Sequence, residues 1–229
     1  MARPTKNEQI PNLAEAIKET AWGHIAEKGA AALSLRAIAR QLKITAPAIY
    51  NYFPDRDALV TALIIDAYTS FGDWQLEACD SVPEKNLAGR LMAVGLAYRN
   101  WALTYPQRYQ LIFGTPIPGY QAPVDRVMPS AARSIRALTG VIEGLRLEGK
   151  LNASGFPEVK QEFKFRFEDW KAYGGDVDIL SLSVAVLVWA RVHGIVSLEI
   201  AGNLPPFGPD GKGLYIYEME TIKRQFIKD

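Results

Sequence analysis

The stretch that decides the fold spans residues 33–59 and reads Leu33-Ser-Leu-Arg-Ala-Ile-Ala-Arg-Gln-Leu-Lys-Ile-Thr-Ala-Pro-Ala-Ile-Tyr-Asn-Tyr-Phe-Pro-Asp-Arg-Asp-Ala-Leu59. Ser34 and Thr45 are good N-caps, and each precedes a short helix of about two turns. The first helix places its apolar residues at i, i+3, i+4 and i+7, which is the spacing of one buried helix face. Pro47 falls in the first turn of the second helix, where proline is tolerated, and Pro54 ends that helix. Two short helices joined by about three or four residues form the pattern of a helix-turn-helix.

The rest of the chain is also predicted to be helical, because apolar spacings of three and four recur along it. Residues 12–28 form a helix that ends at Gly29, and Asp55 caps a long fourth helix that runs to about Cys79. Further helices are predicted over residues 84–105, 107–113, 124–148, 158–172, 178–202 and 214–227. We therefore expect an all-α fold with a three-helix head in residues 1–60 and a larger helical bundle in residues 61–229.

Composition excludes several classes of protein. The 229 residues are 48% hydrophobic, as in an ordinary globular protein, and the single Cys79 excludes an internal disulfide framework. With two histidines and no metal-ligand spacing around His193, we expect neither a metal site nor a cofactor. The N-terminus lacks the apolar segment of a signal peptide, and the most apolar run, residues 179–190, is shorter than the roughly 20 residues of a membrane span. These features predict a cytoplasmic protein without a membrane segment.

The distribution of charge is more informative than the formal net charge of +1. Residues 1–60 carry 8 cations against 6 acids, while residues 61–229 carry 18 cations against 19 acids. Within residues 34–56 the cations are opposed by Asp55 alone; they are Arg36, Arg40, Lys43 and Arg56. The basic excess therefore coincides with the helix-turn-helix, as expected of a surface that binds nucleic acid. The alternative is two ordinary amphipathic helices with solvated arginines.

Residues 33–59 closely resemble the TetR family of transcriptional regulators. The matching features include Ile38-Ala39, Ile44-Thr45, Ile49-Tyr50 and the Arg56-Asp57-x-Leu59 opening of the fourth helix. The resemblance implies a DNA-binding head joined by the long fourth helix to an all-helical regulatory domain. The sequence departs from the family at Lys43, which replaces the usual turn glycine and costs about 1–2 kcal/mol if that residue must be left-handed. Tyr52 replaces a frequent histidine, and Arg56 replaces a frequent lysine.

The second helix of such a motif enters the major groove, and its exposed residues then meet DNA. Arg36 lies on the preceding helix, which follows Ser34, and projects toward the groove. We assign base readout to it, because the contact of arginine with guanine is the commonest specific contact. Pro47 and Ala48 are expected to touch base edges or a thymine methyl group. Phosphate contacts are assigned to the remaining polar residues: Ser34, Lys43, Thr45, Tyr50, Asn51, Tyr52 and Arg56. As alternatives, Arg36 is a phosphate or salt-bridge residue and Tyr50 packs partly into the head.

The second half of the chain resembles the regulatory domain of a TetR subfamily named WHG after its Trp…His-Gly element. The resemblance rests on Trp101–Phe113 and on Trp189-Ala-Arg-Val-His-Gly194. It implies a small-molecule effector, and the aromatic residues favour a hydrophobic or aromatic one in an apolar pocket. The candidate lining residues are Trp74, Trp101, Tyr105, Phe113, Tyr120, Trp170, Trp189 and His193. Each of them, taken singly, is more often plain core, and the Pro/Gly-rich loop 114–123 is a candidate lid.

The helix over residues 178–202 is apolar almost all round, so it must be covered on every side. Pairing residues 178–202 and 214–227 with a second copy predicts a homodimer. Two-fold symmetry then places two recognition helices about 34 Å apart on a pseudo-palindromic operator in double-stranded DNA. Burial within one chain is the alternative.

The sequence thus predicts a DNA-binding repressor that a small apolar or aromatic effector releases from its operator. It is not expected to be an enzyme, because nucleophile–base pairs, phosphate-binding loops and metal spacings are lacking. The alternative is a helical carrier of lipophilic ligands, or an enzyme, without DNA binding. That alternative leaves Arg36, Lys43 and Arg56 without a role.

Overall fold

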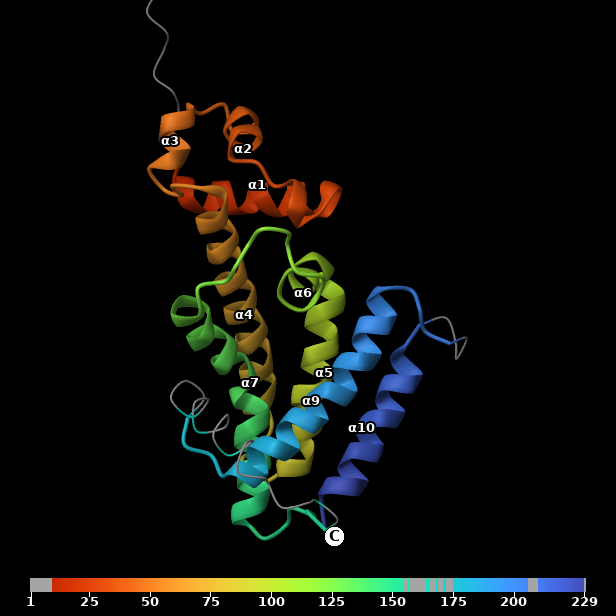
Figure 1. The fold of residues 1–229 in the computed structure, drawn as a ribbon. Coiled ribbons are helices and arrows are strands. Elements are labelled where there is room, and N and C mark those ends of the chain that lie inside the picture. Colours follow the sequence, from red (N-terminus) through yellow and green to blue (C-terminus); the bar gives the residue numbers. More distant parts are fainter. Residues whose placement is uncertain are drawn as a thin grey trace, which may run out of the picture.

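The chain folds into a small head on an elongated helical body (Figure 1). The computed structural model describes residues 10–154, 156, 164, 168, 171, 175–205 and 210–228. Over these residues the chain is helical, with one isolated β-bridge between Leu151 and Ile227. The expected all-α fold is therefore confirmed. The predicted helix over residues 158–172 lies outside the described residues except at isolated positions.

The head consists of α1 (Leu13–Lys28), a 3₁₀ turn (Ala30–Ala32), α2 (Leu35–Gln41) and α3 (Ala46–Tyr50). The 3₁₀ turn was not predicted, and α3 ends at Tyr50 rather than at residue 53. The body contains α4 (Arg56–Asp80), α5 (Leu87–Thr104), α6 (Pro106–Phe113), α7 (Val124–Leu147), α9 (Ile179–Ile200) and α10 (Lys212–Phe226).

Side-chain caps start the helices of the head at the predicted positions. The Oγ of Ser34 accepts the N–H of Ala37 at 3.4 Å, and the Oγ1 of Thr45 accepts the N–H of Ala48 at 3.4 Å. These bonds satisfy backbone donors that a helix N-terminus leaves unpaired. Because the caps fix where α2 and α3 begin, they also fix which side chains face the head core.

The turn between α2 and α3 adopts the left-handed conformation at Lys43, where φ is 54°. The N–H of Ile44 reaches back to the carbonyl of Ala39 at 3.0 Å, which closes the end of α2. A lysine Cβ is strained in this conformation, whereas glycine is not. The turn thus keeps its required geometry with a cationic side chain exposed on it.

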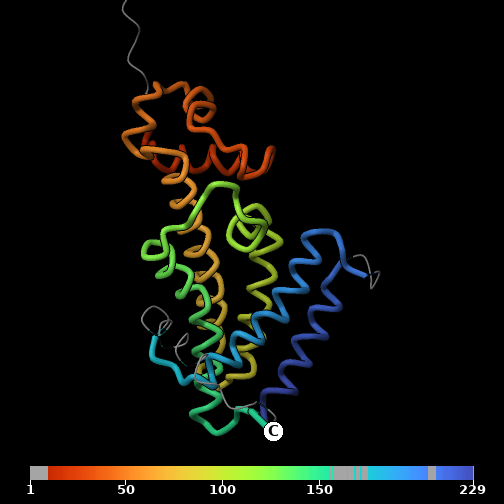
Figure 2. Tube along the Cα trace, viewed as in Figure 1, coloured from red at the N-terminus to blue at the C-terminus, as the bar shows by residue number. Residues whose placement is uncertain are grey.

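Helix α4 connects the head with the body and belongs to the core of each. Leu59 and Leu63 of α4 are fully buried with Ile17 of α1, Ile38 of α2 and Ile49 of α3. Farther along the same helix, α4 contributes Phe71 and Cys79 to the body core, to which α5, α7, α9 and α10 also contribute side chains. Figure 2 traces this continuous path from the head into the body, beside α7. A displacement of α4 would therefore change the packing of both the head core and the body core.

Helix α9 packs against α5, α7 and α10 but is not covered on all sides. Its length and apolar composition would allow it to cross a membrane. In the fold, however, Glu199 of α9 forms a nearly buried ion pair with Arg99 of α5, with nitrogen–oxygen distances of 2.8 and 2.5 Å. Leu187 and Leu198 of α9 remain 48% and 44% exposed, and Tyr217 of α10 remains 73% exposed. Apolar surface of α9 and α10 is therefore left exposed by the described part of the chain.

Replacing Lys43 by glycine is expected to stabilise the protein, because glycine removes the strain of the left-handed turn. The gain is about 1 kcal/mol after the extra flexibility of glycine in the unfolded chain is counted, or a rise in Tm of roughly 2–4 °C by calorimetry. Lys43→Ala is the matched control, since it removes the charge but keeps the Cβ. Equal Tm values for the two variants would contradict strain at this turn.

Candidate functional site

The residues predicted to contact DNA lie on α2, on the turn, on α3 and at the start of α4. Ala48 and Arg56 are partly exposed; the remaining eight, Ser34, Arg36, Lys43, Thr45, Pro47, Tyr50, Asn51 and Tyr52, are exposed. The large rings of Tyr50 and Tyr52 are 40% and 50% exposed, while Ile49 and Phe53 anchor the same segment in the head core. The segment therefore presents aromatic hydroxyl groups outward and apolar side chains inward.

Three cations of this surface are not neutralised by ion pairs within the described part of the chain. Arg36, Arg40 and Lys43 have no carboxylate partner there. The guanidinium of Arg56 lies 4.0 Å from Asp57, and its Nε is buried without a hydrogen-bond partner. A surface of unpaired cations and hydroxyl groups suits the phosphate oxygens of a nucleic acid.

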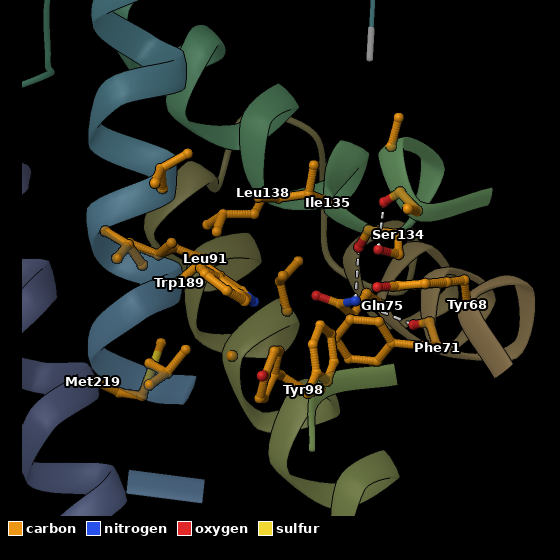
Figure 3. Close-up of a pocket in the computed structure, with 18 of the residues that line it drawn as sticks. Tyr68, Phe71, Gln75, Leu91, Tyr98, Ser134, Ile135, Leu138, Trp189 and Met219 are labelled. Atoms are coloured by element: carbon orange, nitrogen blue, oxygen red, sulfur yellow. Dashed lines mark hydrogen bonds between the residues drawn. The ribbon is translucent and has the colours of Figure 1, made fainter. Parts of the chain in front are cut away.

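The body contains a second candidate site, a cavity of about 370 Å³ lined by residues of α4, α5, α6, α7, α9 and α10 (Figure 3). This volume falls within the range of sites for small molecules. Aromatic rings of four different helices line it, namely those of Phe71, Tyr98, Phe113 and Trp189. Aliphatic and small side chains of α5, α7 and α9 complete the wall, and no described lining residue carries a charge. The cavity is therefore shaped for an apolar molecule.

Close packing of α4 on α7 forms one wall of the cavity. Gly72 permits this approach, because a Cβ at that position would lie 3.1 Å from the Cα of Ser134. Three residues along α4, the buried amide of Gln75 donates to the carbonyl of Ser134 at 2.9 Å. Helix α4 thus touches α7 through its backbone and one polar side chain at the cavity edge.

Two of the predicted effector-binding residues, Phe113 and Trp189, lie in the cavity wall. His193 stacks on Trp189 with ring centroids 4.8 Å apart and lies behind the wall. Its Nδ1 is 2.9 Å from the hydroxyl groups of both Tyr98 and Tyr109. Burial lowers the pKa of His193, so its imidazole is neutral at pH 7, and an unprotonated Nδ1 can accept a hydrogen bond from one of these two hydroxyl groups.

The other predicted effector-binding residues lie elsewhere in the structure. Trp101 is fully buried in the body core, where its indole N–H donates to Ser70 at 3.0 Å. Trp74 and Tyr105 pack edge to face at 5.8 Å, beside a groove between α1 and α4. The hydroxyl of Tyr120 bonds to Thr61 at 2.9 Å near the head. Trp170 lies outside the described residues.

Sequence reasoning missed most of the cavity wall. The missed residues are Tyr68, Gln75 and Tyr98 and a series of small and aliphatic residues that includes Ala131, Ala132, Ser134, Ile135, Leu138, Val192 and Met219. The spacing of residues 124–148 identifies the inward face of α7. It does not indicate which part of that face borders empty space, because this depends on how three other helices pack.

Comparison with known proteins agrees with this arrangement. The family described as bacterial regulatory proteins, tetR family, matches residues 17–63, and a Tetracyclin repressor-like C-terminal domain matches residues 91–222. The HTH-type transcriptional regulators Mb1846 of Mycobacterium bovis and Rv1816 of Mycobacterium tuberculosis are each 35% identical to the chain over 197 residues. Each match covers 82% of this chain and 80% of the relative.

Solved structures show the same fold. The crystal structure of the regulatory protein SCO4313 has 34% identity and a TM-score of 0.73, and it covers 93% of this chain and 98% of its own. A tetR-family regulatory protein from Rhodococcus RHA1 has 16% identity and a TM-score of 0.66, over 96% of this chain and 100% of its own. The matched families span both the helix-turn-helix and the body with its cavity. The chain therefore belongs to the TetR family of DNA-binding transcriptional regulators.

Proposed function

We propose that the protein is a cytoplasmic, non-enzymatic homodimeric repressor that leaves its operator when a small apolar molecule enters the cavity. Residues 1–60 form the DNA-binding domain, and residues 61–229 form the domain for ligand binding and dimerisation. One observation carries this proposal. Helix α4 supplies three residues of the cavity wall, Tyr68, Phe71 and Gln75, and four buried residues of the head core, Leu59, Val60, Leu63 and Ile64. A molecule that changes the packing of α4 therefore changes the placement of the head.

We assign DNA contacts to the exposed residues of the head. Arg36 reads a guanine, Pro47 and Ala48 approach base edges, and Lys43 and Arg56 contact phosphates together with the hydroxyl and amide groups of Ser34, Thr45, Tyr50, Asn51 and Tyr52. The exposure of these side chains and the lack of described ion-pair partners for Arg36 and Lys43 support the assignment. On a helical carrier or an enzyme these exposed cations would have no function.

The Arg36→Ala, Tyr50→Ala double variant is expected to lose affinity for a DNA fragment from the region upstream of the protein's own gene. Loss of one base contact costs about 1–3 kcal/mol, so affinity falls about 5- to 150-fold in a fluorescence-anisotropy titration at fixed salt. Lys28→Ala is the matched control, because it removes an exposed cation of α1 outside the proposed surface. Unchanged binding by the double variant, or an equal loss in the control, would refute the assignment.

A second route from the cavity to the head runs through α6. Phe113 of α6 lines the cavity, and Tyr109 of α6 bonds to His193 behind the wall. The neighbouring Arg108 lies over the ring of Trp22 in α1, with its Cζ 5.3 Å from the ring centroid. Such a cation–π contact joins α6 directly to the head. A ligand that displaces Phe113 would therefore act on the head through α6 as well as through α4.

Filling the cavity is expected to abolish the response to effectors. Uncharged apolar compounds are first selected by a rise in Tm of the wild type, and operator affinity is then measured with and without each one. Compounds that stabilise the wild type but not Ile135→Trp should weaken operator binding, by about 5- to 150-fold for a coupling of 1–3 kcal/mol. Arg136→Trp, on the exposed side of the same helix, should respond as the wild type does. Cavity-bound compounds that leave operator affinity unchanged would contradict ligand release.

We assign the dimer interface to the apolar surface that α9 and α10 leave exposed. Leu187 and Leu198 are eleven residues apart, so they lie on the same side of α9, and Ile216 and Tyr217 extend the surface onto α10. Exposed apolar patches of this kind mark sites of association. Two such helices from each chain would form a four-helix interface. The family typically acts as homodimers, and this surface is suited to that role.

The Leu187→Glu, Leu198→Glu double variant is expected to be a folded monomer, because four carboxylates cannot be buried at a symmetric interface without partners. Light scattering after size-exclusion chromatography measures the mass, and far-UV circular dichroism confirms that helix content is kept. Leu147→Glu, at a 71% exposed position of α7, serves as the control and should stay dimeric. A dimeric double variant would place the interface elsewhere.

A further inference from the structure

One buried polar side chain interrupts the apolar wall of the cavity. Gln75 lies on α4 with 3% of its surface exposed, among aromatic and aliphatic lining residues. Its Nε2 donates to the carbonyl of Phe71 at 3.1 Å and to the carbonyl of Ser134 at 2.9 Å. Both protons of the amide are therefore used by the protein.

These two bonds also fix the orientation of the amide. Carbonyl oxygens accept hydrogen bonds and cannot donate, so only the nitrogen of Gln75 can face Phe71 and Ser134. The oxygen, Oε1, must then face the other way. Figure 3 shows it pointing away from Ser134 and toward the middle of the lining residues. The cavity thus contains a hydrogen-bond acceptor whose direction is set by α4 and α7.

The neighbouring hydroxyl groups are committed to other acceptors. The Oγ of Ser134 donates to the carbonyl of Ala131 at 2.6 Å, and the hydroxyl of Tyr98 bonds to His193 at 2.9 Å. The hydroxyl of Tyr68 is directed at the carbonyl of Ile112 at 3.4 Å. In the part of the chain that the structure describes, no group donates to Oε1 of Gln75. Oε1 is not among the wholly buried unpaired atoms of these residues, so it is open to the cavity, and an acceptor in an otherwise apolar wall favours a ligand that brings its own donor.

The remaining wall determines the rest of the ligand. No described lining residue is charged, so an anionic or cationic ligand would lose its hydration without a compensating ion pair. An anion would in addition face the negative end of the Gln75 amide. A neutral molecule with an apolar body gains from burial against Phe71, Tyr98 and Trp189.

We infer that the cavity takes a small, uncharged, apolar molecule with a hydroxyl or N–H group that donates to Oε1 of Gln75. This inference rests on the proposed function, in which the cavity is the effector site. It adds the class of ligand and the side chain that distinguishes a hydroxylated molecule from its parent hydrocarbon. An acceptor that faces the cavity discriminates because a ligand without a donor covers it and leaves it unpaired.

The test compares three probes of nearly the same shape by equilibrium dialysis: 2-naphthol, 2-methoxynaphthalene and naphthalene. The wild type should bind 2-naphthol about 10-fold more tightly than naphthalene, the ratio expected for one hydrogen bond to a buried acceptor. 2-Methoxynaphthalene keeps the oxygen but lacks the O–H, so it should bind no better than naphthalene. In Gln75→Leu the preference for 2-naphthol should disappear while naphthalene still binds. Gln110→Leu, the same change at an exposed position of α6 outside the cavity wall, should keep the preference.

Three results would overturn the inference: no binding of any probe, equal binding of 2-naphthol and 2-methoxynaphthalene to the wild type, or an intact preference in Gln75→Leu. The comparison within the wild type decides the question even if Gln75→Leu fails to fold. Failure of the proposed function gives a different result. In that case 2-naphthol binds with the Gln75-dependent preference, yet no cavity ligand changes operator affinity.

Discussion

The shared burial of α4 is the constraint on which the rest of the structure depends. Its first turns are buried among α1, α2 and α3, and its later turns are buried among the helices of the body. Because protein interiors are close-packed, neither set of contacts can shift without a response from its neighbours. The helix therefore transmits displacement between two cores that otherwise meet mainly through α6 and α1. A head on a flexible linker would bind DNA equally well but could not respond to a ligand in the body.

Helices α4 and α7 approach each other beside the cavity, where we propose that a ligand acts. Gly72 lets the two backbones come close, and the Gln75 amide bridges them by donating to Ser134. The same side chain presents its oxygen to the cavity, so a bound ligand meets the contact between α4 and α7 directly. On the opposite side, Trp189 and Tyr98 surround His193, whose bond to Tyr109 leads into α6. Helices α4 and α6, which both contact the head, thus each contribute a side chain to the cavity wall.

Much of the head could be predicted from the sequence, because its determinants are local. Ser34, Thr45 and Asp55 cap their helices with their own side chains, and these bonds depend on residues three positions away. The left-handed turn at Lys43 was indicated only by the family resemblance, in which glycine is usual at this position. The cavity is different, since its wall comes from helices far apart in sequence. Their aromatic side chains made Phe113 and Trp189 candidates for the pocket wall, but Trp101, which fills the core, was a candidate for the same reason. Whether an inward residue meets a neighbour or an empty space depends on tertiary packing, to which a single sequence gives no direct access.

We propose that the cavity and the operator surface are two binding sites coupled through α4 and α6. Coupling between binding sites is reciprocal, so the operator must alter ligand affinity by the factor with which the ligand alters operator affinity. The most direct measurement is the Kd of one cavity ligand with and without saturating operator DNA, at constant salt. We expect weaker binding of the ligand to the operator-bound protein, by the same factor by which the ligand weakens the operator complex. A ligand that binds the free and the operator-bound protein with equal affinity would contradict it.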